Sequence, residues 1–224
     1  MPSVFITGAS RGLGLEFARQ YSAEGWSVVA ACRRPSDVPQ LEEWGVEAVA
    51  VDVTDFAAVA VLARRLAGRA FDLLLNNAGV YGQDQEFGSI DGEDWQRVMR
   101  TNVIAPLKVA EAFLPHVLAG RRRVMAFLSS RMGSVTENDS GGSYIYRSSK
   151  AALNAAVRSL AVDLRPQGVT AILLHPGWVR TDMGGHAAPL EVEARVAGLR
   201  GVIDAAGPAD SGTFRDYTGA TVPW

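Results

Sequence analysis

The chain has 224 residues, 48% of them apolar, which is enough for one domain with a sizeable buried core. A formal net charge of −2 gives no electrostatic reason to expect nucleic acid or an anionic membrane as a partner. The single cysteine excludes an internal disulfide, no apolar run approaches the roughly 20 residues of a membrane span, and strand-like sequence begins at Ser3, so we expect a cytoplasmic protein without a signal peptide.

Apolar runs of strand length alternate with segments of helical periodicity along the whole chain. The strand-like runs are short and nearly unbroken, and they cover residues 4–6, 28–31, 48–51, 73–75, 124–128 and 170–174. The helix-like segments lie near residues 12–24, 55–68, 93–118 and 145–165. Unbroken apolar strands are typical of a parallel sheet that is buried on both faces. The alternation predicts an α/β fold, a Rossmann-type doubly wound parallel sheet with helices on both faces.

No repeat, low-complexity tract or interdomain linker interrupts this alternation, so residues 1–224 are expected to form a single domain. The segment 184–207 breaks the rhythm. We interpret it as a loop-plus-helix excursion that acts as a lid, followed by a short C-terminal strand. In such folds ligands bind beyond the carboxyl ends of the strands, which is where every motif described below falls.

A glycine-rich loop, Thr7–Gly14, joins the first strand to the first helix. Where side chains are missing, backbone N–H groups can approach a pyrophosphate, and the helix N-terminus adds partial positive charge. The spacing Gly-x3-Gly-x-Gly differs from the commoner Gly-x-Gly-x-x-Gly, and the loop lacks the ending of an ATP-binding loop. An ordinary glycine-rich turn is the alternative. The predicted dinucleotide contacts here are Gly8, Ser10, Arg11, Gly12, Leu13 and Gly14.

The end of the second strand bears on the choice of cofactor. A carboxylate about 20 residues past the loop would hold the ribose hydroxyl of NAD, but the sequence there is Cys32-Arg33-Arg34. A guanidinium binds a 2′-phosphate bidentately, whereas a carboxylate would repel it. Arg33 and Arg34, with Arg11 from the loop, therefore favour NADP(H) over NAD(H). The alternative is that these arginines are solvated surface charges.

The ordered set of motifs resembles the short-chain dehydrogenase/reductase family along essentially the whole chain. The matching pieces are Thr7–Gly14, Asp52-Val53, Asn76-Asn77-Ala78-Gly79, Asn102, Ser129-Ser130, Tyr146-x-x-x-Lys150 and Pro176-Gly177-Trp178-Val179-Arg180-Thr181. The pieces most similar to the C-factor and sniffer-type carbonyl reductase branch are Ser130-Arg131-Met132-Gly133-Ser134, Ser140-Gly141-Gly142 and Pro223-Trp224. The resemblance implies an oxidoreductase that transfers a hydride between NADP(H) and a small carbonyl or alcohol substrate.

Tyr146 and Lys150 are four residues apart on a predicted helix, so both project from one face. A phenol with a pKa of about 10 is a poor proton shuttle at neutral pH, and a neighbouring ammonium would lower that pKa. Tyr144 would lie on roughly the opposite side. Only Lys150 and Lys108 are lysines among 22 basic residues, which suggests that a compact ammonium is needed at Lys150. We predict Tyr146 as the acid/base and Lys150 as its partner, with a surface contact as the alternative.

Two further residues are predicted to act in catalysis. Ser130 ends the fifth strand, where its hydroxyl can donate to a substrate carbonyl oxygen, while strand alternation points Ser129 the other way. A serine that only satisfies backbone groups is the alternative. The resemblance implies that Asn102 holds a water in a proton relay, the alternative being a helix-disrupting polar residue. The polar segment 135–143 lengthens the usual separation between Ser130 and Tyr146, and we expect it to loop out beside the pocket.

The resemblance also implies the remaining cofactor contacts. These are Asp52 and Val53 at the adenine, Asn77, Ala78 and Gly79 beside the adenosine ribose, Pro176, Gly177, Val179 and Thr181 at the nicotinamide carboxamide, and Tyr146 and Lys150 at the nicotinamide ribose.

Other features predict no chemistry of their own. His116, His175 and His186 lack the spacing of metal ligands, so no metal site is expected. Cys32 follows a buried strand and is interpreted as a core residue. The stripe of small apolar residues over 151–164 faces either the core or the isologous interface of a homodimer or homotetramer, as in the family.

Two other functions remain open on the sequence alone. A catalytically weak nucleotide sensor or signalling protein would need only the phosphate loop, and the presence of the serine, tyrosine and lysine disfavours it. A sugar-nucleotide epimerase or dehydratase would need a substrate domain, and the sequence after Gly207 is too short for one.

Overall fold

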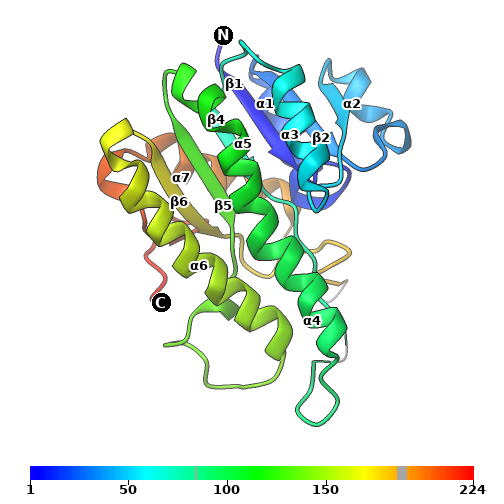
Figure 1. Ribbon diagram of the computed structural model, residues 1–224, viewed down its shortest axis with the longest axis vertical. Helices are drawn as coiled ribbons and strands as arrows, with labels where there is room; N and C mark the ends of the chain where they lie inside the picture. The colour runs from blue at the N-terminus through cyan, green and yellow to red at the C-terminus, as the bar shows by residue number, and fades with distance from the viewer. Residues whose placement is uncertain (84, 186–190) are drawn as a thin grey trace.

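A seven-stranded parallel sheet forms the middle layer of the computed structural model, which describes residues 1–83, 85–185 and 191–224 (Figure 1). Its strands are β1 (Ser3–Thr7), β2 (Ser27–Cys32), β3 (Glu47–Ala50), β4 (Leu73–Asn76), β5 (Val124–Leu128), β6 (Thr170–His175) and β7 (Phe214–Asp216). The helices are α1 (Gly12–Ala23), α2 (Gln40–Glu43), α3 (Phe56–Arg65), α4 (Gly92–Met99), α5 (Ala105–Ala119), α6 (Tyr144–Leu164) and α7 (Val192–Ala205). The predicted α/β fold with a doubly wound parallel sheet is confirmed.

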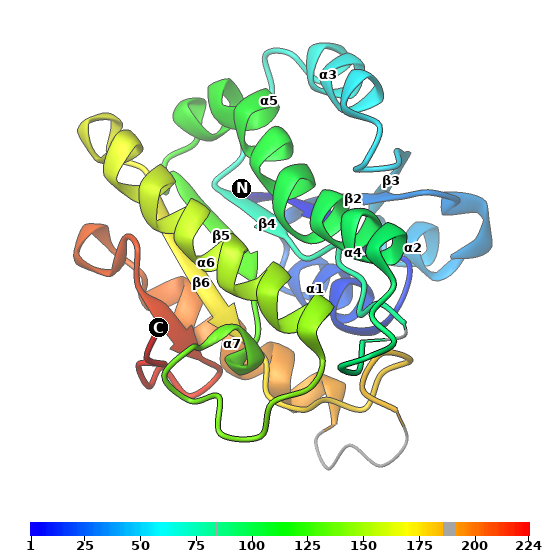
Figure 2. The same ribbon diagram turned by 60° about the horizontal axis from the view of Figure 1, so that its bottom comes forward.

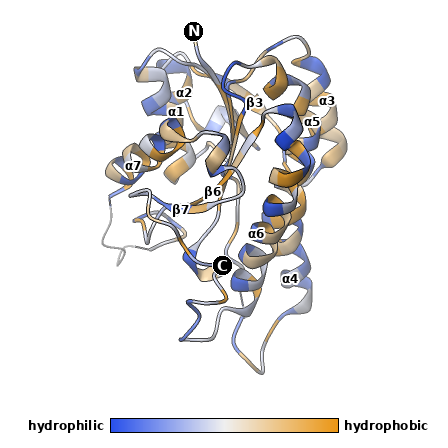
Figure 3. Ribbon diagram, turned by 90° about the vertical axis from the view of Figure 1, so that its left-hand side faces the viewer, coloured by the Kyte–Doolittle hydropathy of each residue, from blue (hydrophilic) through white to orange (hydrophobic). Residues whose placement is uncertain are grey.

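Helices cover both faces of this sheet (Figure 3). α1, α2 and α7 lie on one face, and α3, α5 and α6 lie on the other. Two apolar cores form between the layers because successive strand residues point to opposite faces. Phe5 contacts the rings of Phe71 and Phe113 in one core, while its neighbour Ile6 joins Phe17 in the other. Strands β1 to β6 each supply residues to both cores, which explains their unbroken apolar runs.

The strand order β3-β2-β1-β4-β5-β6-β7 reverses direction beside β1. β1 pairs with β2 on one side and with β4 on the other, so the chain turns away from this point in both directions. A crevice beyond the carboxyl ends of the strands is expected at such a reversal. Figure 2 brings this end of the sheet forward, together with the long loop between β5 and α6.

The predicted helical stretch 93–118 is not one continuous α-helix. A π-helical turn, Arg100–Ile104, separates α4 from α5. Such a turn accommodates an extra residue per turn and re-aims the side chains around it. Here it contains Asn102, whose side chain bonds both backbone groups of Val80. The prediction missed this break because helical periodicity continues across it.

The segment 184–207 includes α7, which belongs to the core. Val196, Leu199 and Ile203 of this helix are buried against the sheet and α1. Residues 186–190, which include His186, lie outside the described residues, and the lid role of this segment stays a prediction. The four-residue helix α2 was not predicted, because it is too short to show periodicity. In the part of the chain that the structure describes, no helix is both long and apolar enough to cross a membrane.

Candidate active site

A cavity of about 440 Å³ opens beyond the carboxyl ends of the strands, at the reversal of strand order. Many of the predicted cofactor residues line it. They are Gly8, Ser10, Arg11, Gly12, Leu13, Arg33, Asp52, Val53, Asn77, Ala78, Gly79, Tyr146, Lys150, Pro176 and Thr181. The structure therefore brings together residues that lie up to 173 positions apart in the sequence. The other predicted residues, Gly14, Arg34, Asn102, Ser130, Gly177 and Val179, are not among its lining residues.

The glycine loop is held against the end of β4. The Asn77 amide nitrogen donates to the carbonyl oxygens of Thr7 and Gly8, both at 3.0 Å. The Thr7 hydroxyl accepts the backbone N–H groups of Asn77 and Ala78 at 3.1 and 3.2 Å. Gly8 adopts φ +68°, and a Cβ there would lie 2.8 Å from the Ala78 Cα. Close approach of two backbones, which only glycine permits, therefore shapes the loop.

Gly12 and Gly14 serve different contacts of the same loop. Gly12 adopts φ +55°, and a Cβ there would lie 3.3 Å from Cγ2 of Thr181, so the loop meets the segment after β6 at this point. A Cβ on Gly14 would overlap the Gly8 carbonyl. Gly14 thus permits internal packing of the loop, while Gly12 opens the N-terminus of α1 to the cavity. α1 has no side-chain cap and no acidic residue in its first turn, so its free N–H groups suit an anion.

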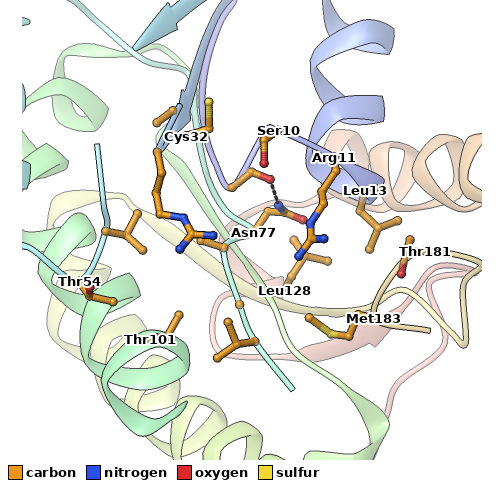
Figure 4. Close-up of a pocket in the computed structure, with 18 of the residues that line it drawn as sticks. Ser10, Arg11, Leu13, Cys32, Thr54, Asn77, Thr101, Leu128, Thr181 and Met183 are labelled. Carbon is orange, nitrogen blue, oxygen red and sulfur yellow. Dashed lines mark hydrogen bonds between the residues drawn. The ribbon is translucent and has the colours of Figure 1, made fainter. Parts of the chain in front are cut away.

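The three arginines predicted for the 2′-phosphate occupy different positions. Arg33 lines the cavity, whereas Arg34 forms an exposed ion pair with Asp37 at 2.9 Å. Arg11 pairs with Asp182 at 2.5 Å and lies between the glycine loop and Thr181 (Figure 4). Arg33 and Arg11 therefore reach the cavity from the ends of two neighbouring strands.

Two arginines at the same end of the cavity were not predicted. Arg97 pairs with Asp94 at 2.5 Å. Arg100 donates to the Thr54 carbonyl at 2.7 Å and stacks 4.4 Å above the Phe56 ring. They lie on α4 and the π-helical turn, and no spacing in the sequence links them to the glycine loop.

Tyr146 and Lys150 project from one face of α6 into the cavity, as their spacing predicts. Both side chains are buried. The Lys150 ammonium donates to the Leu128 carbonyl at 2.8 Å and lies 5.7 Å from the centroid of the Tyr146 ring. Tyr144 is 40% exposed and contacts Phe87, so it faces away from this pair.

The electrostatics of Tyr146 differ from the sequence-based expectation. Burial raises the pKa of Tyr146 to about 12, and a hydrogen bond with the Ser130 side chain opposes this rise only in part. Burial also lowers the pKa of Lys150 to about 8. The expected lowering of the phenol pKa by the ammonium is not what the protein alone produces, because the cavity disfavours both charges and Lys150 is bonded to Leu128. Tyr146 is a protonated phenol at neutral pH.

Ser129 and Ser130 point to opposite sides, as strand alternation predicts. The Ser130 hydroxyl bonds with Tyr146 and accepts the Met132 N–H at 3.2 Å. Ser129 instead donates to Oδ1 of Asn154 at 2.6 Å, inside the fold. Ser130 is therefore the serine that shares the site with Tyr146.

Asn102 connects the end of β4 to α6. Its Oδ1 accepts the Val80 N–H at 2.9 Å, and its Nδ2 donates to the Val80 carbonyl at 2.8 Å and to the Ser149 hydroxyl at 3.0 Å. A Cβ on Gly79 would lie 3.4 Å from this Oδ1 and 3.7 Å from the Lys150 ammonium. Asn102 thus lies close to the lysine, and its side chain bonds protein groups.

The predicted nicotinamide segment folds back on itself after β6. Gly177 adopts φ +83°, and the Thr181 hydroxyl accepts the Gly184 N–H at 3.2 Å. The Trp178 indole donates to the Gly184 carbonyl at 2.8 Å. Pro176 and Thr181 reach the cavity, opposite the glycine loop. The closed turn holds them there.

His116 and His175 have structural contacts. Nε2 of His116 lies 3.1 Å from the Leu66 carbonyl, and Nδ1 of His175 accepts the Arg131 N–H at 3.2 Å. Burial lowers the pKa of His175 to about 4, so it is neutral at physiological pH. Among the described residues, no group of three or more histidine, cysteine or acidic side chains is arranged to hold a metal ion.

Comparison with known proteins gives one consistent result. The family model described as short chain dehydrogenase matches residues 2–218. The C-signal protein of Myxococcus xanthus is 50% identical over 153 residues, which is 68% of this chain and 92% of the relative.

Two solved structures share the fold over their whole length. Carbonyl reductase Sniffer of D. melanogaster is 31% identical, with a TM-score of 0.93 and full coverage of both chains. The NADPH-bound carbonyl reductase from chicken fatty liver is 32% identical, with a TM-score of 0.93 and coverage of 100% of this chain and 99% of that one.

Proposed function

The chain belongs to the short-chain dehydrogenase family of oxidoreductases, and on that premise we propose that it transfers a hydride between NADP(H) and a carbonyl or alcohol substrate. Tyr146 is the general acid/base of this reaction. The observation that carries the proposal is the buried phenol of Tyr146, bonded to Ser130, in one cavity with Lys150 and the glycine loop.

The residues present fit a dinucleotide. Gly8 and Gly12 leave backbone where side chains would fill the cradle, and the uncapped first turn of α1 offers N–H groups to a pyrophosphate. We assign Asp52 and Val53 to the adenine, Asn77, Ala78 and Gly79 to the adenosine ribose, and Lys150 to the nicotinamide ribose. Pro176, Gly177, Val179 and Thr181 are assigned to the carboxamide end.

NADPH, when bound, supplies the hydride that reaches the carbonyl carbon. Ser130 and Tyr146 donate hydrogen bonds to the carbonyl oxygen, which gains negative charge as the hydride arrives. The raised pKa keeps the proton on Tyr146 until that charge develops, and the proton then passes to the oxygen. The Lys150 ammonium stabilises the resulting phenolate, and Asn102 holds the water through which the site is reprotonated.

The preference for NADP(H) over NAD(H) is also part of the proposal. Arg33 and Arg11 line the cavity and would bind the 2′-phosphate, while Arg34, which is not among the lining residues, has a supporting role. We further propose that the segment 184–207, apart from the core helix α7, contributes the lid. The outward side of α6 over residues 151–164 is proposed as the interface of a homodimer or homotetramer, since Leu153, Val157, Ala161 and Leu164 face the core. A cytoplasmic location completes the proposal.

A panel of aldehydes, ketones and quinones with NADPH tests the proposed function, with NADPH binding followed in parallel by fluorescence. We expect saturable turnover on at least one carbonyl class. Tight NADPH binding without turnover on any member of the panel would favour the alternative, a nucleotide-sensing or signalling protein.

A further inference from the structure

The first turn of α6 carries Tyr146 but lacks the usual cap. Ser143 precedes the helix in the left-handed conformation, with φ 48° and ψ 42°, and its hydroxyl makes no bond to the helix. An N-cap serine would normally accept the N–H of the third helical residue, which here is Tyr146. This N–H therefore needs an acceptor from elsewhere in the fold.

Gln85 supplies that acceptor from 61 positions away in the sequence. Its Oε1 accepts the Tyr146 N–H at 2.8 Å, and its backbone carbonyl accepts the Tyr144 N–H at 3.4 Å. Gln85 is only 6% exposed, so the bond is shielded from water. Its Nε2 donates to the Tyr81 carbonyl at 3.2 Å, which fixes the orientation of the amide.

Tyr81 contacts the same helical turn. Its ring lies 4.6 Å from the Tyr146 ring, centroid to centroid, and its hydroxyl lies 2.9 Å from the Ser143 hydroxyl. The loop that carries Tyr81 and Gln85 is in turn tied to α4, because the Gln83 N–H donates to Asp94 at 2.6 Å. The side chains of Tyr81 and Gln85, here called the Tyr81–Gln85 clamp, thus hold both the backbone and the ring of Tyr146.

We infer that Gln85 is a positioning residue for proton transfer: it caps the catalytic helix from outside and, with Tyr81, fixes where the Tyr146 hydroxyl lies. This inference rests on the proposed function. Proton transfer needs heavy atoms within hydrogen-bond reach, and a small displacement of the acid lowers the rate steeply. An uncharged amide also suits this place, since a carboxylate beside Tyr146 would disfavour the phenolate.

The charges around Tyr146 allow a test of whether an uncharged side chain is needed at position 85. The titratable groups that face Tyr146 are Lys150 on its own helix and Tyr81 on the loop after β4. Asp94 on α4 is engaged by Gln83 and Arg97. The Glu86 carboxylate lies beside Gly142, just before α6. A new carboxylate at position 85 would add a buried negative charge at the Tyr146 N–H itself.

Two substitutions of Gln85 separate its roles, and the same substitutions of Gln83, an exposed residue of the same loop, are the controls. Gln85→Met keeps the length and removes the acceptor. We expect kcat for carbonyl reduction to fall about tenfold, with the Kd for NADPH unchanged and hydrogen exchange of the Tyr146 amide about tenfold faster. Gln85→Glu keeps an oxygen that can accept the Tyr146 N–H, so this variant should retain most of the parent's kcat. It should also shift the pH profile of alcohol oxidation upward by about half a unit, because the base form of Tyr146 is disfavoured.

The outcomes are distinguishable. If the parent reduces carbonyls and both Gln85 variants match their Gln83 counterparts in kcat and pH profile, the inference is overturned. Faster amide exchange with an unchanged kcat would make Gln85 a structural cap only, which also overturns it. If Gln85→Met does not fold, the upward pH shift in Gln85→Glu, absent from Gln83→Glu, decides the question. A parent that turns over no carbonyl refutes the proposed function, while amide exchange still reports on the cap.

Discussion

The two halves of the proposed site are built in different ways. In the half proposed for the cofactor, the glycine loop and the end of β4 are neighbouring strand ends. The Thr7 hydroxyl and the Asn77 amide bond backbone groups across these ends and hold them together. The half proposed for the substrate lies at the start of α6, next to irregular segments on either side of it in space. The Tyr81 hydroxyl lies 2.9 Å from the Ser143 hydroxyl, and Gln85 accepts the Tyr146 N–H. Contacts between distant residues hold both halves, but only the residues of the first half belong to short motifs that can be recognised in the sequence.

Tyr146 lies where the two halves meet. Removing its hydroxyl should therefore give the largest difference between the effect on turnover and the effect on NADPH binding. Tyr146→Phe deletes the proton donor without changing the shape of the ring. We expect turnover to fall by about 10²-fold or more while the Kd for NADPH stays within about twofold. Steady-state rates and fluorescence titration measure the two quantities. Tyr144→Phe is the matched control, and a loss in that variant with none in Tyr146→Phe would reverse the assignment of the helix face.

Lys150→Arg tests whether the site beside Tyr146 needs a compact ammonium. The guanidinium keeps the positive charge, but it is broader than the ammonium that donates to the Leu128 carbonyl and does not fit in its place. We therefore expect kcat to fall about thirtyfold. The exposed Lys108→Arg should match the parent. The pKa of Lys150 is lowered to about 8, so its charge is lost as the pH rises through that value, and reduction by the parent should decline above it. That decline should be missing from Lys150→Arg. Full activity in this variant would mean that Lys150 has no role in catalysis.

Gly8→Ala perturbs the cofactor half alone. Both Gly8 and Gly141 have φ near +65°, so alanine strains the backbone at either position by about 1 kcal/mol. Only at Gly8 would the new Cβ meet another backbone, at 2.8 Å, whereas at Gly141 it meets open space. We expect NADPH affinity to fall about twentyfold in Gly8→Ala and to stay near the parent in Gly141→Ala, by fluorescence titration. Equal losses would mean that backbone strain, and not close approach, governs the loop.

Arg33→Asp has the smallest expected effect and concerns the far end of the cofactor half. The parent should prefer NADPH to NADH by about tenfold, or roughly 1.4 kcal/mol, because Arg33 reaches the cavity where NAD-binding proteins place a carboxylate. The substitution should abolish or invert this preference. Arg34→Asp, at a residue paired with Asp37, should change it less. A parent that uses both cofactors equally would refute the assignment.

The sequence predicted where the glycine loop and the residues after β4 lie, for a physical reason. The loop Thr7–Gly14 and the residues after β4 occupy strand ends whose positions follow from the parallel topology. The spacing of Tyr146 and Lys150 is a helical period, and the opposite faces of Ser129 and Ser130 are a strand period. Periodicity and order along the chain carried all of these predictions.

The features that were missed depend on distant partners. Gln85 caps α6 from a loop with no periodicity, and the π-helical turn contains Asn102, whose side chain bonds Val80 from 22 positions away. The pKa of Tyr146 was expected to fall, because its spacing from Lys150 was known but its burial was not. A buried polar residue such as Gln85, or a lone asparagine within an apolar helix, is the signal that a sequence offers for such contacts.

The most direct test of the proposed function is the fate of the hydride. Parent protein is incubated with NADPH deuterated at the transferring position and with the best carbonyl of the panel, and the alcohol is analysed by mass spectrometry and NMR. We predict one deuterium on the carbinol carbon, at a rate that Tyr146→Phe lowers by about 10²-fold or more. Bound NADPH with no deuterium in any product, or the same rate of transfer in Tyr146→Phe, would contradict the account.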